Sequence, residues 1–470
     1  MNRTVLPVVV VAAACAVLLL VGGADGSSPT TVPPDPVPHA DPAGALTSSW
    51  FCPSPQGGPA TDVAATIDIA NTTSAPRTGT VRWLAAATGT ATVAPFSVGP
   101  GAVLTVAAPP ASSALVQSTG GGVVVEQSAA GTTGRAVAHC ASDTSPTWYT
   151  ANGSTLVDAT EVLSLFNPFP SDAVVDIEFS TEEGREAPGA VQGLVIPAGR
   201  TTFVDATATV RRQQVTAAAV RARTGQLVVT RLQRFDGSAG RAGLSLTLAA
   251  RAAAVQWTFP NAASTAADVT GWQVFNPDTR EAEVTIASFP TSGDAPEPID
   301  ITVPPRSQVT VPAARDGGVP TGVPFTSTVT SSNEVPVVAE RLVDVRAPDT
   351  HPGWTSVLGS PAPARRLAFA AGDTSAGAEQ WLAIFNPGQT PAKVDISSMT
   401  AAGRAPIAAL QGVVVPPSSQ VVFRMNDYVQ AAPLGLEIDA TEPVVVDRTM
   451  TTIGATGLSI TAGVPLADPG

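Results

Sequence analysis

The residues of this chain that could carry chemistry are few, and their spacing matches no catalytic or metal-binding motif. The three histidines, His39, His139 and His351, do not stand at the spacing of a metal ligand set or of a catalytic triad. His139 directly precedes Cys140, where a two-ligand zinc site competes with the simpler interpretation of a strand-end histidine. The chain also has no Gly-x-Ser-x-Gly motif, no phosphate-binding loop and no paired-cysteine motif. We therefore predict no catalytic residue, no metal site, no cofactor and no enzymatic activity.

Acidic residues outnumber basic ones, and the formal net charge is −13. Lys393 is the single lysine, and this acidic balance argues against nucleic-acid binding, which needs clustered lysine and arginine. The densest acidic group comprises Glu161, Glu178, Glu182 and Glu183. Acidic residues in the loops of an acidic protein are usually solvated, so we interpret this group as surface charge.

Two carboxylate–arginine pairs, Glu340-Arg341 and Asp447-Arg448, follow equivalent runs of valine and alanine. A third arginine, Arg231, stands at the same place in a related segment. An active site is built once, whereas a residue that recurs in several segments serves the scaffold. Adjacent residues of a strand face opposite sides, so one member of each pair should point to the interior or to a cross-strand partner. We predict that these arginines are structural.

A short apolar strand ending in Phe-Asn-Pro occurs three times and indicates an internal repeat. The positions two and four before the Asn are apolar in every copy, as expected for a strand with one buried face. Proline removes a donor from the sheet, and Asn favours turns, so each strand should end there. The repeated asparagines are Asn167, Asn276 and Asn386, with a less complete copy at Asn71.

The repeat length and the turn signals predict an all-β protein. Each repeat of about a hundred residues contains around seven short β-branched runs separated by turn residues, which is typical of a β-sandwich. We therefore predict four tandem immunoglobulin-like or fibronectin-like β-sandwich modules after an N-terminal hydrophobic segment, with the strand connectivity left open. The predicted modules are residues 49–147, 148–256, 257–366 and 367–470.

The N-terminus predicts export from the cytoplasm. Arg3 precedes nineteen uncharged residues, 5–23, which are long enough to span a bilayer and also suit a secretory signal. Residues 1–24 are thus either a signal anchor, with the N-terminus inside, or a signal peptide cleaved near Ala24. Residues 25–48 are rich in Pro, Ser and Thr and predict a disordered or polyproline-like tether.

Two cysteines outside the hydrophobic segment, Cys52 and Cys140, fall in the first and last strands of the first module. Because these strands lie near each other in a sandwich and the compartment is oxidising, we predict a disulfide, with free thiols or an intermolecular bridge as alternatives. The bridge would close a loop of roughly 88 residues and stabilise the fold by about 4–5 kcal/mol. Trp381 is out of phase with its buried face and is our candidate for an exposed recognition aromatic.

The layout resembles an uncharacterised family of actinobacterial secreted or membrane-anchored envelope proteins of unknown function with tandem β-sandwich modules. The residues that carry the resemblance are Trp148, Trp257, the three Phe-Asn-Pro turns, Arg231, Arg341 and Arg448. The resemblance covers about residues 50 to 470 and implies a location but no activity. Module one departs most, since it has Ala70-Asn71-Thr72 and an added cysteine pair.

These observations favour a non-catalytic extracytoplasmic scaffold or interaction protein of the cell envelope, tethered to the outer face of the membrane through residues 5–23. The alternative is a polysaccharide-binding array that assists cell-wall assembly. An enzyme whose site is formed between modules is the third hypothesis. The expected partner is an unidentified protein or a cell-wall polysaccharide.

Overall fold

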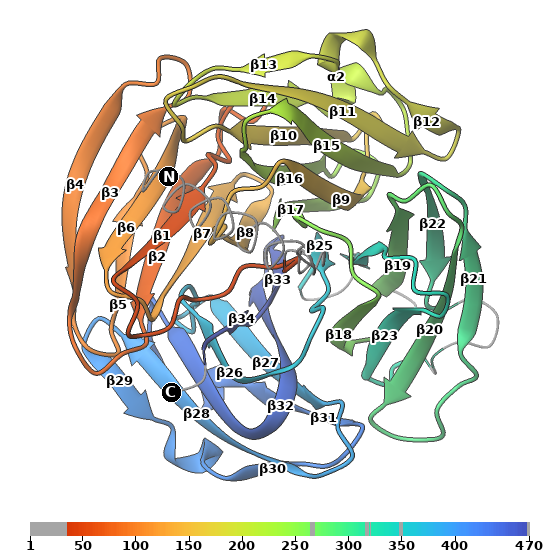
Figure 1. The fold of residues 1–470 in the computed structure, drawn as a ribbon. Helices are drawn as coiled ribbons and strands as arrows, with labels where there is room; N and C mark the ends of the chain where they lie inside the picture. The colour runs from red at the N-terminus through yellow and green to blue at the C-terminus, as the bar shows by residue number, and fades with distance from the viewer. Residues whose placement is uncertain (1–34, 264–267, 315–318, 320, 347–350, 468–470) are drawn as a thin grey trace, which may run out of the picture. The chain divides into compact units, whose positions relative to one another are not determined.

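The structure is a computed structural model that describes residues 35–263, 268–314, 319, 321–346 and 351–467. From Asp35 onward the chain forms one compact unit built almost entirely of antiparallel strands (Figure 1). Its helical elements are single turns: α2 (Ala206–Thr209), η1 (Gly189–Val191), η2 (Ala408–Leu410) and η3 (Met425–Asp427). Within these residues no helix has the length and apolarity to cross a bilayer, and the predicted segment 5–23 lies outside them.

Module 2 illustrates the sandwich, which consists of two facing antiparallel sheets. One sheet has the order β14-β10-β16-β17; the other has the order β12-β11-β15-β9, and β13 also pairs with β11. Side chains alternate between buried and half-buried along β11, because successive residues of a strand face opposite sides of the sheet. The strands are β9 (Thr147–Gly153), β10 (Ala159–Phe166), β11 (Ala173–Thr181), β12 (Gly184–Glu186), β13 (Leu194–Ile196), β14 (Thr201–Asp205), β15 (Thr216–Thr224), β16 (Val228–Asp236) and β17 (Ala242–Leu248).

The same two-sheet arrangement recurs in modules 1 and 3. Module 1 has the orders β5-β2-β7-β8 and β1-β6-β3-β4, and module 3 has β22-β19-β24-β25 and β18-β23-β20-β21. Module 1 comprises β1 (Thr47–Cys52), β2 (Ala64–Asn71), β3 (Arg77–Ala85), β4 (Ala91–Val98), β5 (Val103–Ala107), β6 (Ser112–Thr119), β7 (Val123–Gly131) and β8 (Gly134–His139). Module 3 comprises β18 (Gln256–Ala262), β19 (Asp268–Asn276), β20 (Ala282–Pro290), β21 (Ile299–Val303), β22 (Ser307–Pro312), β23 (Phe325–Ser331), β24 (Val338–Val345) and β25 (Gly353–Leu358).

Module 4 differs in that one long strand, β32, serves both sheets and an additional strand, β34, pairs with β26. Its first part pairs with β28 and β26, and its second part pairs with β27 and β33. Its strands are β26 (Ala364–Phe369), β27 (Ala378–Asn386), β28 (Ala392–Thr400), β29 (Gly403–Pro406), β30 (Val413–Val415), β31 (Ser419–Arg424), β32 (Gly435–Thr452), β33 (Leu458–Ala462) and β34 (Val464–Pro465).

The fold class predicted from the sequence is confirmed: the chain is all-β and built of immunoglobulin-like sandwich modules. The sequence left the connectivity open. In an immunoglobulin domain the first strand pairs with the second and the seventh pairs with the sixth. Here the first and seventh strands have exchanged places. In module 2 the first strand, β9, pairs with β15, and β16 pairs with β10. Because of this exchange, the final strand β17 forms the edge of the sheet that contains β10.

These final strands bring the four modules together. β8 lies beside β17, β17 beside β25, β25 beside β33, and β33 beside β8, so the modules close into a ring around these four strands (Figure 1). Hydroxyl groups join neighbouring strands: the backbone N–H of Ser356 donates to Ser245 Oγ (3.2 Å), and that of Val137 donates to Ser459 Oγ (2.9 Å). The sequence predicted modules in tandem but not this closure.

Residues 25–48 were predicted to be a disordered tether, but residues 35–48 of this stretch contact the modules. Residues 35–46 lie on the ring, and residues 47 and 48 already belong to β1. The N–H of Arg251 in module 2 donates to the carbonyl of Pro36 (3.3 Å). Ala40 N–H donates to the carbonyl of Pro465 in module 4 (3.0 Å), and Gly122 N–H in module 1 donates to that of Asp41 (2.9 Å). The prediction missed these contacts because backbone groups make them, and composition does not reveal backbone partners.

Candidate functional site: buried ion pairs between modules

The three recurring arginines lie at the junctions between modules, and each pairs with a carboxylate of the next module. Arg231, in β16, is fully buried and donates to both oxygens of Glu340 in β24 (3.1 and 2.6 Å). Such a bidentate pair joins a planar guanidinium to a carboxylate in one orientation. The pair therefore fixes module 2 against module 3, which we call the 2–3 junction.

The same pair closes the ring between the last module and the first. Arg448, in β32, donates from both terminal nitrogens to Glu126 in β7 (3.1 Å each), and both side chains are fully buried. Arg448 also donates to Thr461 Oγ1 (2.7 Å) and to the carbonyl of Ala371. This 4–1 junction joins residues 322 positions apart in the sequence.

The 3–4 junction contains the same arginine with a weaker partner. Arg341, in β24, lies 3.3 Å from Asp447 in β32 through one nitrogen, and its other terminal nitrogen donates to the carbonyl of Pro260 (2.5 Å). Aspartate is one methylene shorter than glutamate, which is consistent with this longer, single contact. Both side chains are buried, as in the other two junctions.

Backbone donors complete two of these junctions but not the third. Ala151 N–H donates to Glu340 (2.7 Å), and the N–H groups of Ala370 and Ala371 donate to Glu126 (2.8 and 2.7 Å). Ala151 follows Trp148 by three residues in module 2, and Ala370 follows Leu367 by three residues in module 4. Pro260 occupies that position in module 3, and proline has no N–H to donate.

These surroundings shift the carboxylate pKa values in opposite directions. Burial acts to raise the pKa of Glu126, but Arg448, His139 and a backbone N–H outweigh it and bring the pKa to about 2. His139 Nδ1 lies 3.3 Å from Glu126. Burial raises the pKa of Asp447 to about 7 despite Arg341, and burial also lowers the pKa of Arg341. Glu126 is therefore ionised at neutral pH, whereas Asp447 is close to its midpoint.

The 1–2 junction has no such pair. Gln127 replaces the arginine and Thr230 replaces the carboxylate, and within the described residues Gln127 Nε2 and Thr230 Oγ1 are buried without a hydrogen-bond partner. An apolar cluster joins these two modules instead. Its members come from both modules: Ala60, Val63, Ala129, Ala136, Ala138, Val162, Leu232, Leu244 and Leu246.

The predicted disulfide lies next to this junction and is confirmed. Cys52, at the end of β1, is bonded to Cys140, which directly follows β8, with the two Cα atoms 4.6 Å apart. Both cysteines are buried. The bridge fixes the point where the chain leaves module 1 for module 2.

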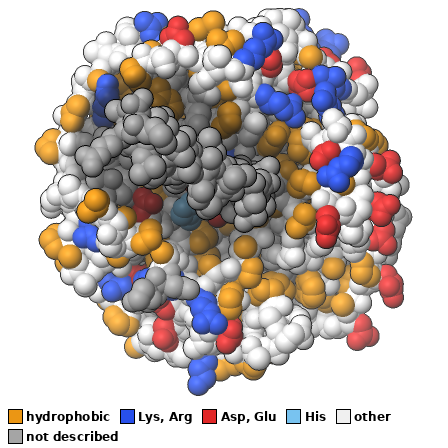
Figure 2. Space-filling view, in the orientation of Figure 1, with side chains coloured by type: hydrophobic (Ala, Val, Ile, Leu, Met, Phe, Trp, Pro, Cys, Tyr) orange, Lys and Arg blue, Asp and Glu red, His pale blue; other side chains and the backbone are white. Residues whose placement is uncertain are grey.

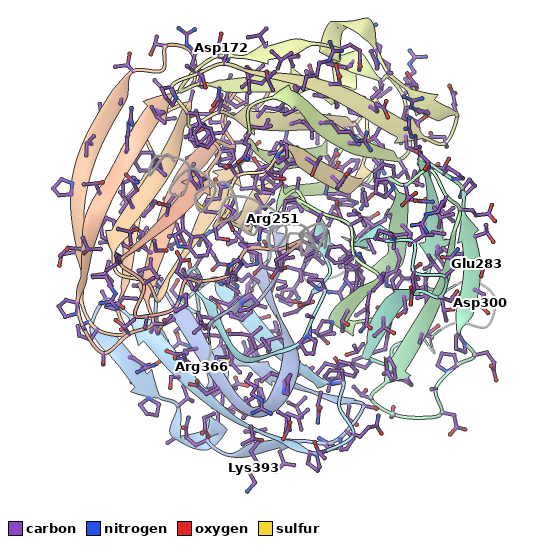
Figure 3. All side chains as sticks on the ribbon, in the orientation of Figure 1. Asp172, Arg251, Glu283, Asp300, Arg366 and Lys393 are labelled. Atoms are coloured by element: carbon purple, nitrogen blue, oxygen red, sulfur yellow. A yellow bond between two sulfur atoms is a disulfide. The ribbon has the colours of Figure 1, made fainter. Side chains whose placement is uncertain are left out.

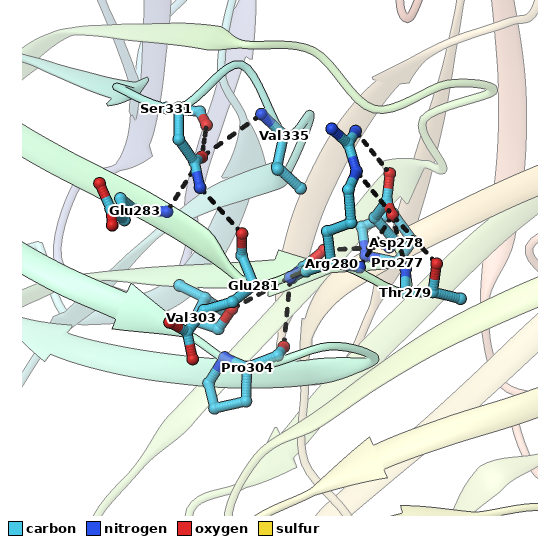
Figure 4. A network of polar contacts seen from close by, with 12 residues as sticks. Pro277, Asp278, Thr279, Arg280, Glu281, Glu283, Val303, Pro304, Ser331 and Val335 are labelled. Carbon is cyan, nitrogen blue, oxygen red and sulfur yellow. Dashed lines mark hydrogen bonds and ion pairs between the residues drawn. The ribbon is translucent and has the colours of Figure 1, made fainter.

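The repeated asparagines hold the same turn in every module. Asn276 is fully buried; its amide donates to the carbonyls of Arg280 (2.7 Å), Val303 (3.0 Å) and Pro304 (3.2 Å), and its carbonyl accepts from Asp278 N–H (2.9 Å). Figure 4 shows Arg280, Val303 and Pro304 converging on this turn. The side-chain amides of the other three asparagines donate to equivalent backbone carbonyls. Asn71 donates to Ala75 and Gly99, Asn167 to Ser171 and Ile196, and Asn386 to Thr390 and Val415.

The other residues singled out from the sequence are dispersed. Trp381 is half-buried on β27, opposite Arg424 and Thr449, and its role in recognition stays a prediction. The acidic group does not act as a unit. Glu161, predicted to be solvated, is instead fully buried; Thr216 donates to it (2.6 Å), and burial raises its pKa to about 7. The sequence carried a signal for this, since Glu161 lies in an apolar strand.

The centre of the ring offers little room for a ligand. The ends of β8, β17, β25 and β33 surround a mostly apolar cavity of about 50 Å³, covered by residues 36–38, which is enough for a few water molecules. Arg251 lies beside these residues, near the middle of Figure 3, and is 2.6 Å from Asp143. Among the described residues no group of three or more His, Cys, Asp or Glu could hold a metal ion.

A search of curated proteins found no match. A tetra-tandem repeat from the extending region of a large adhesion protein is 10% identical, with 89% of this chain and 99% of that chain covered and a TM-score of 0.11. The FN1–FN3 domains of chicken CNTN1 are 9% identical, with 68% and 99% covered and a TM-score of 0.09. These TM-scores are too low to support an argument. A family model matches residues 99–354 and 357–445, and the chain therefore belongs to a family of unknown function, DUF5719.

Proposed function

We propose that this protein is a non-catalytic, extracytoplasmic scaffold of the cell envelope that presents a rigid ring of four modules to a protein partner. The proposal rests on the location of the three recurring arginines. Arg231, Arg341 and Arg448 are all buried in junctions between modules, where they can hold the ring but cannot reach a substrate. The ring is thus built to keep its outer surfaces in fixed positions.

The repeated turns support the same proposal. Four buried asparagines tie each turn to a neighbouring loop of its module, so the turn backbone is the same while the residues that follow the Asn differ. A rigid framework with variable loops is the usual arrangement of interaction modules. The residues two positions after each Asn are Thr73, Phe169, Asp278 and Gly388.

The disulfide supports an extracytoplasmic location, because buried structural disulfides form and persist in oxidising compartments. We propose that residues 5–23 retain the ring at the membrane as a single-pass anchor. N-terminal sequencing of the exported protein, together with fractionation, distinguishes the two alternatives. A mature chain that begins near Asp25 and is found in the medium would show cleavage instead of anchoring.

A photo-crosslinking experiment tests the scaffold role. A photoreactive residue replaces one exposed side chain at a time in the full-length protein in its own cells: Val157 (87% exposed), Val269 (45%) or Val414 (51%). The proposal expects a discrete protein adduct from at least one module. The buried Val229, which lies in a module core, is the matched control and should give none.

Two outcomes contradict the proposal. The first is that no exposed position yields a protein adduct while the purified protein binds cell-wall polysaccharide saturably, which supports the polysaccharide-binding alternative. The second is chemical turnover of an envelope polymer by the purified protein, which supports an enzyme.

A further inference from the structure

A small pocket at the 2–3 junction gathers three arginines from two modules. Arg185 in β12 and Arg221 in β15 belong to module 2, and Arg306 precedes β22 in module 3. Glu178, in β11, lies among them; Arg185 donates to it and Arg221 lies 3.4 Å away. Figure 2 shows Lys and Arg side chains over this part of the surface, between β12 and β22.

The charges of this pocket do not cancel. Burial acts to raise the pKa of Glu178, but Arg185, Arg221 and Arg306 together lower it, so Glu178 is ionised. Three guanidinium groups and one carboxylate leave a local net charge of 3 − 1 = +2, in a protein whose formal net charge is −13. The pocket is therefore a basic site on an acidic protein.

Arg306 is the least satisfied of these cations. Among the described residues, its guanidinium has no hydrogen bond or ion pair. Its backbone has a φ of 53°, in the left-handed region that non-glycine residues seldom adopt. The other modules have the same turn after the strand that precedes it. The residue at the position of Arg306 is Gly101, Gly199 or Ser418, and its φ is also positive. An arginine is therefore not needed for this turn.

Among the described residues, a third arginine is specific to the 2–3 junction: module 4 also places two arginines, Arg366 and Arg404, on Glu437, but Gly101 of module 1 stands there in place of Arg306. In modules 3 and 4 the position of Arg221 is taken by Thr330 and Asp439, and that of Glu178 by Ala287 and Ser397. A feature that recurs in every module serves the scaffold, whereas a cluster built at one junction serves something specific to that junction.

We propose that this pocket binds an oxyanion, a phosphate or carboxylate group carried by an envelope polymer. Guanidinium groups donate in a planar fork that matches phosphate and carboxylate oxygens, and Arg306 has all of its donors available. Arg221 and Arg185 orient the site through Glu178, and Tyr149 lies against Arg221, with the guanidinium carbon 5.8 Å from the ring centre. The pocket is small, about 10 Å³, so it excludes a sugar ring, and the anionic group meets Arg306 at its opening. This site goes beyond the scaffold proposal, which holds with or without it.

Binding by the purified full-length protein tests the site at constant ionic strength. The probes are inorganic phosphate, a glycerophosphate polymer and a glucuronate polymer; the two polymers distinguish a phosphate from a carboxylate source. Arg306→Ser places the residue that module 4 uses into the same turn, so its fold should be retained. We expect it to weaken binding about threefold, the effect of losing one exposed charge contact.

Two further variants sharpen the test. Glu178→Gln removes the competing carboxylate and should bind the same probe more tightly than the native protein. Arg365→Ser, in an exposed ion pair with Glu442 on module 4, is the control and should bind like the native protein. Equal binding by all four proteins, or no binding of any probe, would overturn the site while leaving the scaffold proposal untouched.

Discussion

Glu126 and Asp447 occupy equivalent positions in modules 1 and 4, and each faces a buried arginine of the preceding module. Glu126 accepts two hydrogen bonds from Arg448 and one each from the N–H groups of Ala370 and Ala371. Its pKa falls to about 2, because Arg448, His139 and the backbone N–H of Ala371 together outweigh the effect of burial. The carboxylate of the 4–1 ion pair thus accepts four hydrogen bonds.

Asp447 is buried to a similar degree but accepts a single hydrogen bond, from Arg341 at 3.3 Å. The backbone donor is missing because Pro260 stands in its place, and burial raises the pKa of Asp447 to about 7. A buried pair stabilises a protein only when hydrogen bonds replace the water that both ions lose. The comparison therefore shows that an arginine alone does not offset burial at Asp447, whereas Arg448 together with His139 and a backbone N–H does so at Glu126.

Substituting Arg448→Met should have the largest effect. It leaves Glu126 charged and buried without its main partner, and breaking a buried ion pair in this way costs about 3–5 kcal/mol. Arg341→Met should cost less, because Asp447 takes up a proton near neutral pH. Urea denaturation of both variants measures the difference, with Arg365→Met, in an exposed pair, as the control. Equal losses at the two junctions would contradict the comparison.

The 1–2 junction allows a pair to be installed where none exists. Gln127→Arg and Thr230→Glu reproduce the residues of the other junctions, and each alone buries an unpaired charge. We expect each single substitution to destabilise by a few kcal/mol and the double variant to recover about 1–3 kcal/mol of the summed loss. A double-mutant cycle measured by thermal unfolding checks this coupling. Additive losses would mean that these two positions do not meet.

The two carboxylates should give opposite pH dependences. The folded-state pKa of Asp447, about 7, lies above its ordinary value of 3.8, so its stabilising contribution is complete below about pH 4 and is lost as the pH rises to 7. The folded-state pKa of Glu126, about 2, lies below 4.5, so its contribution is present above pH 4.5 and is lost as the pH falls towards 2. Unfolding curves of Asp447→Asn and Glu126→Gln against the native protein measure each slope. Slopes of the same sign would contradict the assignment.

Converting the 3–4 junction into a stronger one should have the smallest effect. Pro260→Ala with Asp447→Glu supplies the missing N–H and the longer side chain, which reproduces Ala151 and Glu340 of the 2–3 junction. One added hydrogen bond to a buried group stabilises by about 1 kcal/mol. Thermal unfolding at pH 8, where the carboxylate is ionised, measures the gain. A stability loss larger than that of Asp447→Glu alone would show that Pro260 has another role.

Several features of the fold could be predicted because they depend on neighbouring residues. The alternation of apolar side chains predicts the strands, and the Asn-Pro steps predict where they end. Cys52 and Cys140 were predicted to pair because the first and last strands of a sandwich lie close together. The structural role assigned to the recurring arginines rested on repetition alone, and their burial is consistent with it.

Other features could not be predicted from local patterns. Glu340 and Arg341 are adjacent in the sequence but face different junctions, so Glu340 meets Arg231 and Arg341 meets Asp447. The partners lie 109 and 106 residues apart, about one module length, and this period was the one available signal. The oxyanion pocket likewise draws Arg221 and Arg306 from different modules.

The sequence by itself determined the strands, their turns, the sandwich class and the disulfide, since each depends on side-chain alternation or on residues within one module. The tertiary structure alone decided that the modules close into a ring and which carboxylate each arginine meets. The physical reason is the exchange of the first and seventh strands, which places the final strands β8, β17, β25 and β33 at the sheet edges where neighbouring modules meet. A buried charge then takes the partner that this packing brings within hydrogen-bond distance.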